Sequence, residues 1–367
     1  MARIIISGGG TGGHIFPAIA IANALKAIEP GIEILFIGAN GRMEMEKVPA
    51  AGYAIQGLWI SGLQRRLTWK NLIFPIKVIS SLLQADRIVA KFKPDVMIGV
   101  GGYASGPALR VAVRRNIPTL IQEQNSYPGI TNKLLAGKVN RICVAYEGME
   151  RFFPSGKILL TGNPVRQDII TTGDKTEALE HFQLNKGKTV VLIIGGSLGA
   201  GTINKSVLSY LYQQDKISDS QLLWQTGKYY FDQINTDPKL LNREDIRINA
   251  FIDRMDLAYR AADIIVSRAG AIAISELCVI GKPAILIPSP NVAEDHQTKN
   301  AEALSRKSAA IMLKDKEAPE GLFGLIKELI SDKELQNKLS RNIRTMALPG
   351  AANIIASEAM KLVKTIE

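Results

Sequence analysis

The chain has 367 residues, 46% hydrophobic and 22% charged, which is long and apolar enough for two globular domains. Its two cysteines, Cys143 and Cys278, lie far apart without metal-ligand spacing, which excludes a disulfide-rich scaffold and fits a reducing compartment. No apolar run approaches the roughly 20 residues of a spanning helix, and the first predicted strand begins too early for a signal peptide.

The net charge of +11 is concentrated in one half of the chain. Residues 1–163 hold 19 Lys and Arg against 9 Asp and Glu, a net charge of +10, whereas residues 164–367 hold 26 against 25. Such a basic surface suits either nucleic acid or an anionic membrane. Because aromatic residues make up only 6% and no nucleic-acid motif occurs, we expect no nucleic-acid partner.

Short apolar strands alternate with helical patterns along the first half of the chain. We predict strands at 3–7, 32–37, 95–100, 118–122 and 141–145, and helices at 14–28, 68–92, 105–115 and 129–137. This alternation predicts parallel strands joined by crossover helices, that is, an α/β doubly wound sheet. Functional loops of such a sheet lie at the carboxyl ends of its strands.

A glycine-rich turn, residues 8–13, follows the first strand and leads to His14 at the start of a helix. Three of its glycines match G-x-G-x-x-G, in which backbone N–H groups and a helix N-terminus bind phosphate. A dinucleotide site also needs an acidic residue at the end of the second strand, where residues 38–40 are Gly-Ala-Asn. An NAD site is therefore disfavoured, whereas a turn without any ligand would leave His14 unexplained.

The same pattern returns after residues 161–166, which we interpret as a linker. Strands are predicted at 189–194, 221–225, 246–250, 263–267 and 284–287. The first of these leads into a second glycine turn at 195–204. The recurrence predicts two similar domains, 1–163 and 164–348, with a final helix in 349–367 that packs back on the first domain.

The helix predicted at 68–92 carries more apolar residues than one core-facing stripe accounts for. That stripe, which we assign to the core, consists of positions 72, 76, 79 and 83. Trp69, Ile73 and Phe74 fall largely off the stripe, and basic residues surround them. A helix with additional apolar residues and a basic collar can lie on anionic lipid, so we predict a membrane contact here. A helix that serves the core alone is the alternative.

A further candidate site for an anion follows the strand at 263–267, where Gly270 and Ala271 begin a helix. Glu276 lies about a turn and a half into this helix, set back from a bound phosphate. This position suits a carboxylate that accepts hydrogen bonds from ribose hydroxyls. The alternative is a solvent-exposed helix glutamate.

Six motifs occur in the order that is typical of one enzyme family. They are GGGTGGHIFPA (8–18), GGYAS (101–105), EQN (123–125), TGNPVR (161–166), GGSLGA (195–200) and SRAGAIAISEL (267–277). In these motifs, and over nearly its whole length, the chain resembles the MurG family of peptidoglycan glycosyltransferases. The resemblance implies the GT-B fold, with two Rossmann-like domains and a cleft between them.

The resemblance also implies a reaction and a location. N-acetylglucosamine would pass from UDP-N-acetylglucosamine to the 4-hydroxyl of undecaprenyl-pyrophosphoryl-N-acetylmuramyl-pentapeptide, converting lipid I into lipid II. The protein would lie peripherally on the cytoplasmic face of the cell membrane, in contact with its anionic surface. We expect no metal and no cofactor, because no Asp-x-Asp pair appears in a suitable loop.

The family's site residues carry over to matching positions of this chain. The second domain would bind the donor, with the Ile252 backbone at the uracil, Glu276 at the ribose and Gln297 at the sugar hydroxyls. Other expected donor contacts are Thr11, Gly12, Gly13, Asn125, Arg166, Ser197, Ala271, Ile272 and Ala273. The acceptor would lie on the first domain, near Tyr103 and Asn132, with its pyrophosphate at the first glycine turn.

The implied reaction inverts the anomeric carbon in one displacement, which requires a base and stabilisation of the departing UDP. His14 is the first choice of base because the unperturbed pKa of imidazole is ~6.5, and Glu123 is the second. His14 could instead hydrogen-bond a phosphate or the donor sugar. Helix N-termini, backbone N–H groups and Arg166 would stabilise the departing UDP.

Five positions depart from the family pattern, and any function of the family's side chains there is open. They are Gln122, Leu198, Ala269, Ala273 and His296. Two other enzymes of this architecture remain alternatives: a transferase that uses diacylglycerol as acceptor, and a UDP-N-acetylglucosamine 2-epimerase. A nucleotide-binding module without chemistry is disfavoured by His14 and Glu123 at strand ends.

Overall fold

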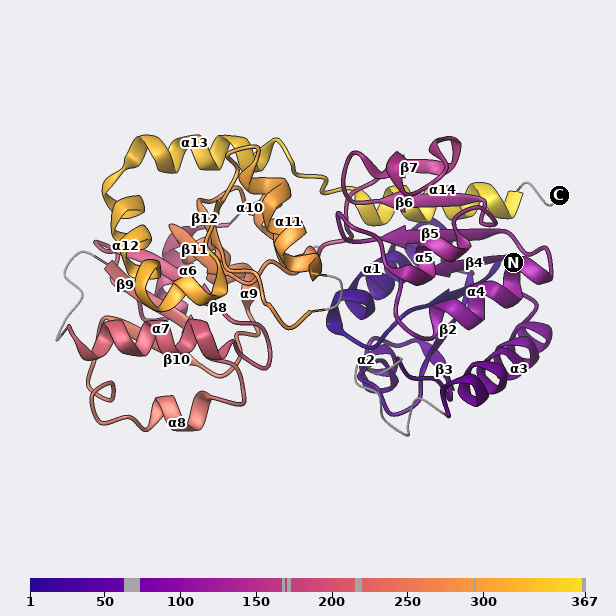
Figure 1. The fold of residues 1–367 in the computed structure, drawn as a ribbon, viewed down its shortest axis with the longest axis horizontal. Coiled ribbons are helices and arrows are strands. Elements are labelled where there is room, and N and C mark those ends of the chain that lie inside the picture. Colours follow the sequence, from indigo (N-terminus) through magenta and orange to yellow (C-terminus); the bar gives the residue numbers. More distant parts are fainter. Residues whose placement is uncertain (63–72, 167–168, 170–172, 215–219, 293–294, 365–367) are drawn as a thin grey trace. The chain divides into compact units, whose positions relative to one another are not determined.

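The structure is a computed structural model, and it describes residues 1–62, 73–166, 169, 173–214, 220–292 and 295–364. The chain forms two compact units, Met1–Val165 with Leu348–Glu367, and Arg166–Ala347. Each unit contains one parallel sheet with helices packed against it (Figure 1). The predicted pair of Rossmann-like parallel-sheet domains is therefore confirmed. The boundary between the units falls after Val165, inside the segment predicted to be a linker.

The sheet of the first unit has the strand order β3-β2-β1-β4-β5-β6-β7. Its strands are β1 (Arg3–Ser7), β2 (Glu33–Ala39), β3 (Ala54–Leu58), β4 (Val96–Gly99), β5 (Thr119–Glu123), β6 (Arg141–Val144) and β7 (Ile158–Leu160). Its helices are α1 (Gly12–Ile28), α2 (Glu44–Ala50), α3 (Phe74–Phe92), α4 (Ser105–Arg114), α5 (Ile130–Leu135) and α14 (Ala351–Lys364). The strand order reverses between β1 and β4, which brings the loops after these two strands together.

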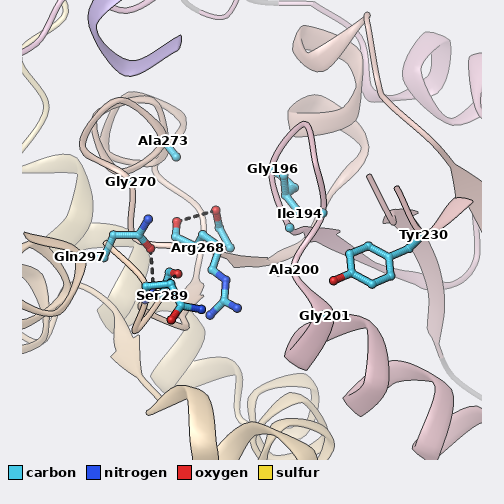
Figure 2. Close-up of a pocket in the computed structure, with 14 residues that line it drawn as sticks. Ile194, Gly196, Ala200, Gly201, Tyr230, Arg268, Gly270, Ala273, Ser289 and Gln297 are labelled. Carbon is cyan, nitrogen blue, oxygen red and sulfur yellow. Dashed lines mark hydrogen bonds between the residues drawn. The ribbon is translucent and has the colours of Figure 1, made fainter. Parts of the chain in front are cut away.

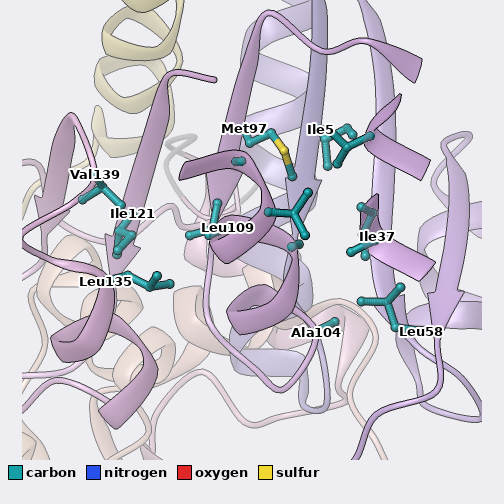
Figure 3. Packing of buried hydrophobic residues seen from close by; sticks show 14 of the residues in the cluster. Ile5, Ile37, Leu58, Met97, Ala104, Leu109, Ile121, Leu135 and Val139 are labelled. Carbon is teal, nitrogen blue, oxygen red and sulfur yellow. The ribbon is translucent and has the colours of Figure 1, made fainter. Parts of the chain in front are cut away.

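The strands of this sheet are apolar because both faces are covered. Ile4 and Ile6 of β1 belong to one buried cluster, and Ile5 belongs to a second cluster with Ile37 and Met97 (Figure 3). Alternate residues of a strand point to opposite faces, so a strand buried on both faces is an uninterrupted hydrophobic run.

The last helix, α14, belongs to the first unit. Its Ala352, Ile355, Ala356 and Ala359 are buried in the same cluster as Ile21 of α1. The small residues allow α14 to pack closely along α1, with which it makes extensive contact. The first unit is therefore built from two separate stretches of the chain.

The sheet of the second unit has the strand order β10-β9-β8-β11-β12-β13. Its strands are β8 (Thr189–Ile194), β9 (Ser220–Gln225), β10 (Ile246–Asn249), β11 (Ile264–Ser267), β12 (Ala284–Leu286) and β13 (Ile311–Met312). Its helices are α6 (Lys175–His181), α7 (Gly201–Tyr212), α8 (Phe231–Asn235), α9 (Met255–Ala261), α10 (Ala271–Ile280), α11 (His296–Ser305), α12 (Ala318–Ser331) and α13 (Lys333–Arg344). The switch in strand order lies between β8 and β11, so the loops after these strands adjoin.

The predicted core stripe on the helix at 68–92 is wrong. Ile76, Ile79 and Leu83 are 59%, 60% and 57% exposed, and Leu72 lies outside the described residues. The buried face of α3 is instead the one that carries Ser81, Ala85, Ile88 and Val89, and α3 packs on α4. Small residues allow the two helices to approach closely, which leaves the larger aliphatic residues facing outward.

Candidate functional site

The second glycine turn lines a cavity of about 450 Å³ within the second unit (Figure 2). Gly196 and Gly199 both have left-handed backbone, with φ of +89° and +87°. A Cβ on Gly199 would lie 2.1 Å from the carbonyl oxygen of Thr226, so the turn requires glycine there. The cavity thus opens beside the start of α7, where unpaired backbone N–H groups favour an anion.

The other wall of the cavity comes from the end of β11, the start of α10, the segment after β12 and the start of α11. It includes Ser267, Arg268, Gly270, Ala273, Ser289, Asn291 and Gln297. Figure 2 shows Arg268 and Gln297 on one side of the cavity and Gly196 and Tyr230 on the other. Because α10 begins at Ala271, two helix N-termini meet around this cavity. Such an arrangement suits a diphosphate.

Arg268 was not among the residues predicted for the site. Its Nη1 donates to the carbonyl oxygens of Ile287 and Pro288, at 3.1 and 3.2 Å, and forms an ion pair with Asp315. Asp315 also accepts from Thr202 Oγ1 at 2.8 Å. The guanidinium is therefore held in place at the cavity wall. Its position directly after β11 was a usable signal, since strand ends of a doubly wound sheet form sites.

Two of the predicted donor residues line the cavity. Gln297 accepts from the Ser289 N–H at 2.9 Å through Oε1, and Ala273 lies in the first turn of α10 beside the half-buried Ala271 and Ile272. Ser197 is exposed in the glycine turn, and Leu198 beside it is also exposed. The departure from the family pattern at Leu198 therefore points to solvent.

Glu276 is buried, so the alternative of a solvent-exposed helix glutamate is wrong. Its Oε1 accepts from Arg166 Nε at 3.1 Å, and its Oε2 accepts from the Tyr259 hydroxyl at 2.8 Å. Burial raises the pKa of Tyr259 well above its usual value, and the neighbouring carboxylate raises it further. Neither Glu276 nor Arg166 belongs to the described residues that line the cavity.

The backbone of Ile252 is engaged within the chain. Its N–H donates to Gln225 Oε1 at 2.9 Å, and Gln225 Nε2 in turn donates to the Gly196 carbonyl at 3.1 Å. Gln225 is buried at the end of β9 and links the glycine turn to the segment after β10. A uracil that binds this N–H would have to displace the glutamine.

The first unit brings its own glycine turns together after β1 and β4. A Cβ on Gly102 would lie 2.2 Å from the carbonyl oxygen of Gly9, so the two turns meet backbone to backbone. His14 lies in the first turn of α1, with Nδ1 3.3 Å from Thr11 Oγ1. Its ring packs over Gly101, where a Cβ would approach to 2.7 Å. Tyr103 is exposed beside this arrangement.

Glu123 ends β5 as a fully buried carboxyl group that holds the loop after it. It accepts from the N–H of Asn125 at 3.0 Å, from Asn125 Nδ2 at 3.2 Å, from the Gly129 N–H at 3.2 Å and from Asn132 Nδ2 at 2.7 Å. Burial raises the pKa of Glu123, and these hydrogen bonds oppose the shift. Asn132 is itself buried, and its Oδ1 has no hydrogen-bond partner among the described residues. The contacts describe a carboxyl group that orders a loop.

The departures at Gln122 and Ala269 are internal. Gln122 is buried and donates to Asn163 Oδ1 at 2.9 Å, and it accepts a hydrogen bond from Gln124. Asn163 also donates to the Gln124 carbonyl at 3.0 Å, which ties the end of β5 to the linker. Ala269 is fully buried after β11. Gln122 is thus part of a buried hydrogen-bond network, whereas Ala269 is packed in the interior. The departure at His296 stands at the first residue of α11, directly before Gln297.

The two halves of the chain match the two domain models of one protein family. The glycosyltransferase family 28 N-terminal domain matches residues 4–144, and the glycosyltransferase family 28 C-terminal domain matches residues 190–355. Among the described residues, no group of three or more His, Cys, Asp or Glu could hold a metal ion, and no helix is long and apolar enough to cross a membrane.

Curated relatives cover almost the entire chain. A Cytophaga hutchinsonii protein named UDP-N-acetylglucosamine--N-acetylmuramyl-(pentapeptide) pyrophosphoryl-undecaprenol N-acetylglucosamine transferase is 57% identical, over 99% of this chain and 97% of that protein. A Bacteroides fragilis protein of the same name is 52% identical, over 98% of this chain and 95% of that protein.

Solved structures share the fold. The crystal structure of Acinetobacter baumannii MurG superposes with a TM-score of 0.79 at 27% identity, covering 98% of this chain and 100% of that one. A UDP-GlcNAc 2-epimerase from Neisseria meningitidis reaches 0.68 at 16% identity, covering 98% and 100%, which shows a common fold alone. With both domain models matched in order and relatives of more than half identity along its length, this chain belongs to glycosyltransferase family 28, within its MurG group.

Proposed function

We propose that the chain transfers N-acetylglucosamine from UDP-N-acetylglucosamine to lipid-linked N-acetylmuramyl-pentapeptide. The observation that carries this proposal is the 52–57% identity, over nearly full length, to proteins whose names state this reaction. The second unit supports it with a cavity between two helix N-termini, which is suited to a nucleoside diphosphate.

The donor occupies the second unit in this proposal. Its diphosphate lies between the turn around Ser197 and the start of α10 at Ala271–Ala273, and Gln297 holds the sugar hydroxyls. Glu276 holds the ribose while it keeps its bonds to Arg166 and Tyr259. This is physically possible because two carboxylate oxygens offer about four acceptor positions. The uracil takes over the Ile252 N–H from the Gln225 side chain.

The departing UDP gains negative charge, and the cavity offers several positive partners for it. Backbone N–H groups at the starts of α7 and α10 carry the positive ends of the helix dipoles. Arg268 adds a guanidinium that Asp315 and two carbonyl oxygens hold in place. Donors that are already positioned stabilise developing charge without the cost of reorganisation.

The acceptor occupies the first unit, with its pyrophosphate at Thr11–Gly13 and its sugar near Tyr103. We assign the base to His14, which lies in the first turn of α1 beside Thr11. We assign Glu123 a positioning role, because its oxygens already accept four hydrogen bonds from the loop that carries Asn125 and Asn132. Carboxyl oxygens that already accept these hydrogen bonds are poorly placed to take the proton of the acceptor hydroxyl, which is what a base must do.

We further propose that the first unit lies on the anionic cytoplasmic face of the cell membrane. The exposed residues Ile76, Ile79 and Leu83 form a stripe on α3, here called the α3 stripe. Lys77 Nζ stands 5.7 Å from the ring centre of the exposed Trp59, beside this stripe. An apolar stripe with basic and aromatic neighbours is typical of interfacial helices. The predicted contact at Ile73 and Phe74 adjoins it, and Trp69 lies outside the described residues.

The test is transfer of radiolabelled N-acetylglucosamine from its UDP ester to lipid-linked muramyl-pentapeptide, with diacylglycerol as the competing acceptor. We expect label in the muramyl lipid and none in diacylglycerol. Label in diacylglycerol alone would reject the proposal in favour of a glycerolipid transferase. Conversion of the donor to UDP-N-acetylmannosamine without any acceptor would instead indicate the epimerase.

A further inference from the structure

The first glycine turn binds a carboxyl group of its own chain. Glu44, the first residue of α2, is 1% exposed. Its Oε2 accepts from the Gly10 N–H at 2.8 Å, and its Oε1 accepts from the Ala39 N–H at 2.9 Å. No ion pair to Glu44 occurs within the described part of the chain. The polar partners of this buried group are thus a backbone N–H in the turn after β1 and one at the last residue of β2. A buried carboxyl group is costly unless it is hydrogen-bonded.

Two glycines leave the room that Glu44 fills. A Cβ on Gly9 would lie 2.2 Å from Glu44 Oε1, and a Cβ on Gly38 would lie 2.5 Å from Glu44 Cγ. Gly9 also has φ of +153°, which disfavours a side chain. This part of the glycine-rich motif therefore accommodates an internal carboxyl group, and not the close approach of a ligand.

The Gly10 N–H is a donor that a turn of this type ordinarily offers to a phosphate. Because Glu44 occupies it, we propose that Glu44 is a positioning residue that acts as a built-in anion and fixes the shape of the first glycine turn. A short path connects it to the proposed base: Gly10 precedes Thr11, the N-cap of α1, and Thr11 Oγ1 lies 3.3 Å from His14 Nδ1. The same occupation makes one backbone donor of the first glycine turn unavailable to a ligand.

This inference rests on the proposed function, in which the first turn and His14 serve the acceptor. Replacing Glu44 should consequently impair transfer without weakening the donor site. In a Glu44→Ala variant we expect kcat to fall by about tenfold to a hundredfold, as for a small misplacement of a reacting group. The dissociation constant of UDP, measured by calorimetry, should stay within twofold of wild type. Glu46→Ala is the matched control, since Glu46 is exposed on the same helix.

Chemical rescue separates the proposed role from simple filling of space. Formate or acetate should restore part of the lost kcat in Glu44→Ala, because a small carboxylate can accept from both backbone N–H groups. Formamide and chloride at the same concentration should not. Glu44→Gln keeps the volume but directs an NH2 group at a backbone donor, so it should also lose activity. Hydrogen–deuterium exchange of residues 8–13 should speed up in Glu44→Ala and slow again with formate.

Several outcomes would overturn the inference. Wild-type kcat in a folded Glu44→Ala, or in Glu44→Gln, would show that no carboxyl group is needed. Lost activity with equal failure of formate and formamide would show that Glu44 only fills space. If Glu44→Ala does not fold, Glu44→Gln carries the test. If the wild-type chain transfers no N-acetylglucosamine, the proposed function fails, while the exchange measurement still decides whether Glu44 fixes the turn.

Discussion

Removing the α3 stripe should release the protein from anionic vesicles. The perturbation is the triple variant Ile76→Ser, Ile79→Ser and Leu83→Ser. Fully burying such a side chain is worth ~1.5–3 kcal/mol, so side chains that are 57–60% exposed contribute about 1 kcal/mol each when they enter lipid. The three together amount to about 3 kcal/mol, or roughly a hundredfold in the partition coefficient.

The assay is flotation of the full-length protein with vesicles that contain anionic phospholipid. A matched control is Leu241→Ser, since Leu241 is 62% exposed but belongs to the second unit. Folding should be unaffected, because the replaced side chains already face solvent, and UDP affinity should persist. An unchanged partition coefficient for the triple variant, or an equal loss for the control, would refute the assignment of the α3 stripe to the membrane.

Three further predictions concern the second unit. Glu276→Gln should weaken UDP binding by about tenfold or more. Tyr259→Phe, which removes one hydrogen-bond partner of Glu276, should weaken UDP binding less. Equal calorimetric affinities of wild type and Glu276→Gln for UDP would contradict the ribose role of Glu276. Gly199→Ala should lower the midpoint temperature of thermal unfolding far more than Gly196→Ala. Both glycines have left-handed backbone, but only Gly199 lacks space for a Cβ. Similar midpoint temperatures for the two variants would contradict this prediction. Burial lowers the pKa of Lys282 from 10.5 to about 8, so the folded chain releases this proton first and stability should rise between pH 8 and about 10 relative to Lys282→Met. Parallel stability curves for the two proteins would disprove the shift.

The sequence predicted the central strands of both sheets because those strands are buried on both faces. β1 and β8 contain the apolar runs Ile4–Ile6 and Val190–Ile194, a glycine follows each strand, and the predicted bounds are those that the structure has. The short strands β3, β7 and β13 were missed. Each lies at an edge of its sheet, where partial exposure removes the hydrophobic run that identifies a strand. The helix α2 was missed for a similar reason, since only Glu44 and Val48 of it are buried.

A sequence pattern does not predict which side chains form hydrogen bonds between segments that are distant in the sequence. Periodicity selected positions 72, 76, 79 and 83 as the core face of this helix, whereas the face that is buried carries Ser81, Ala85, Ile88 and Val89. The dinucleotide pattern places a carboxylate directly at the end of β2, where this chain has none. Glu44 instead lies at the start of α2, and its side chain accepts a hydrogen bond from the Gly10 N–H. Glu276 was placed correctly on α10, but its bonds to Arg166 and Tyr259 join segments that are distant in sequence.

The return of α14 to the first unit has a consequence for the order in which the protein is made. A ribosome releases the chain from its N-terminus, so the apolar side of α1 that α14 covers stays bare until residues 351–364 have emerged. The segment Arg166–Ala347 is continuous and can complete its core earlier. The first unit therefore cannot complete its core until its C-terminal helix is available, and a chain cut before residue 348 would keep the whole sequence of the second unit but lack part of the core of the first.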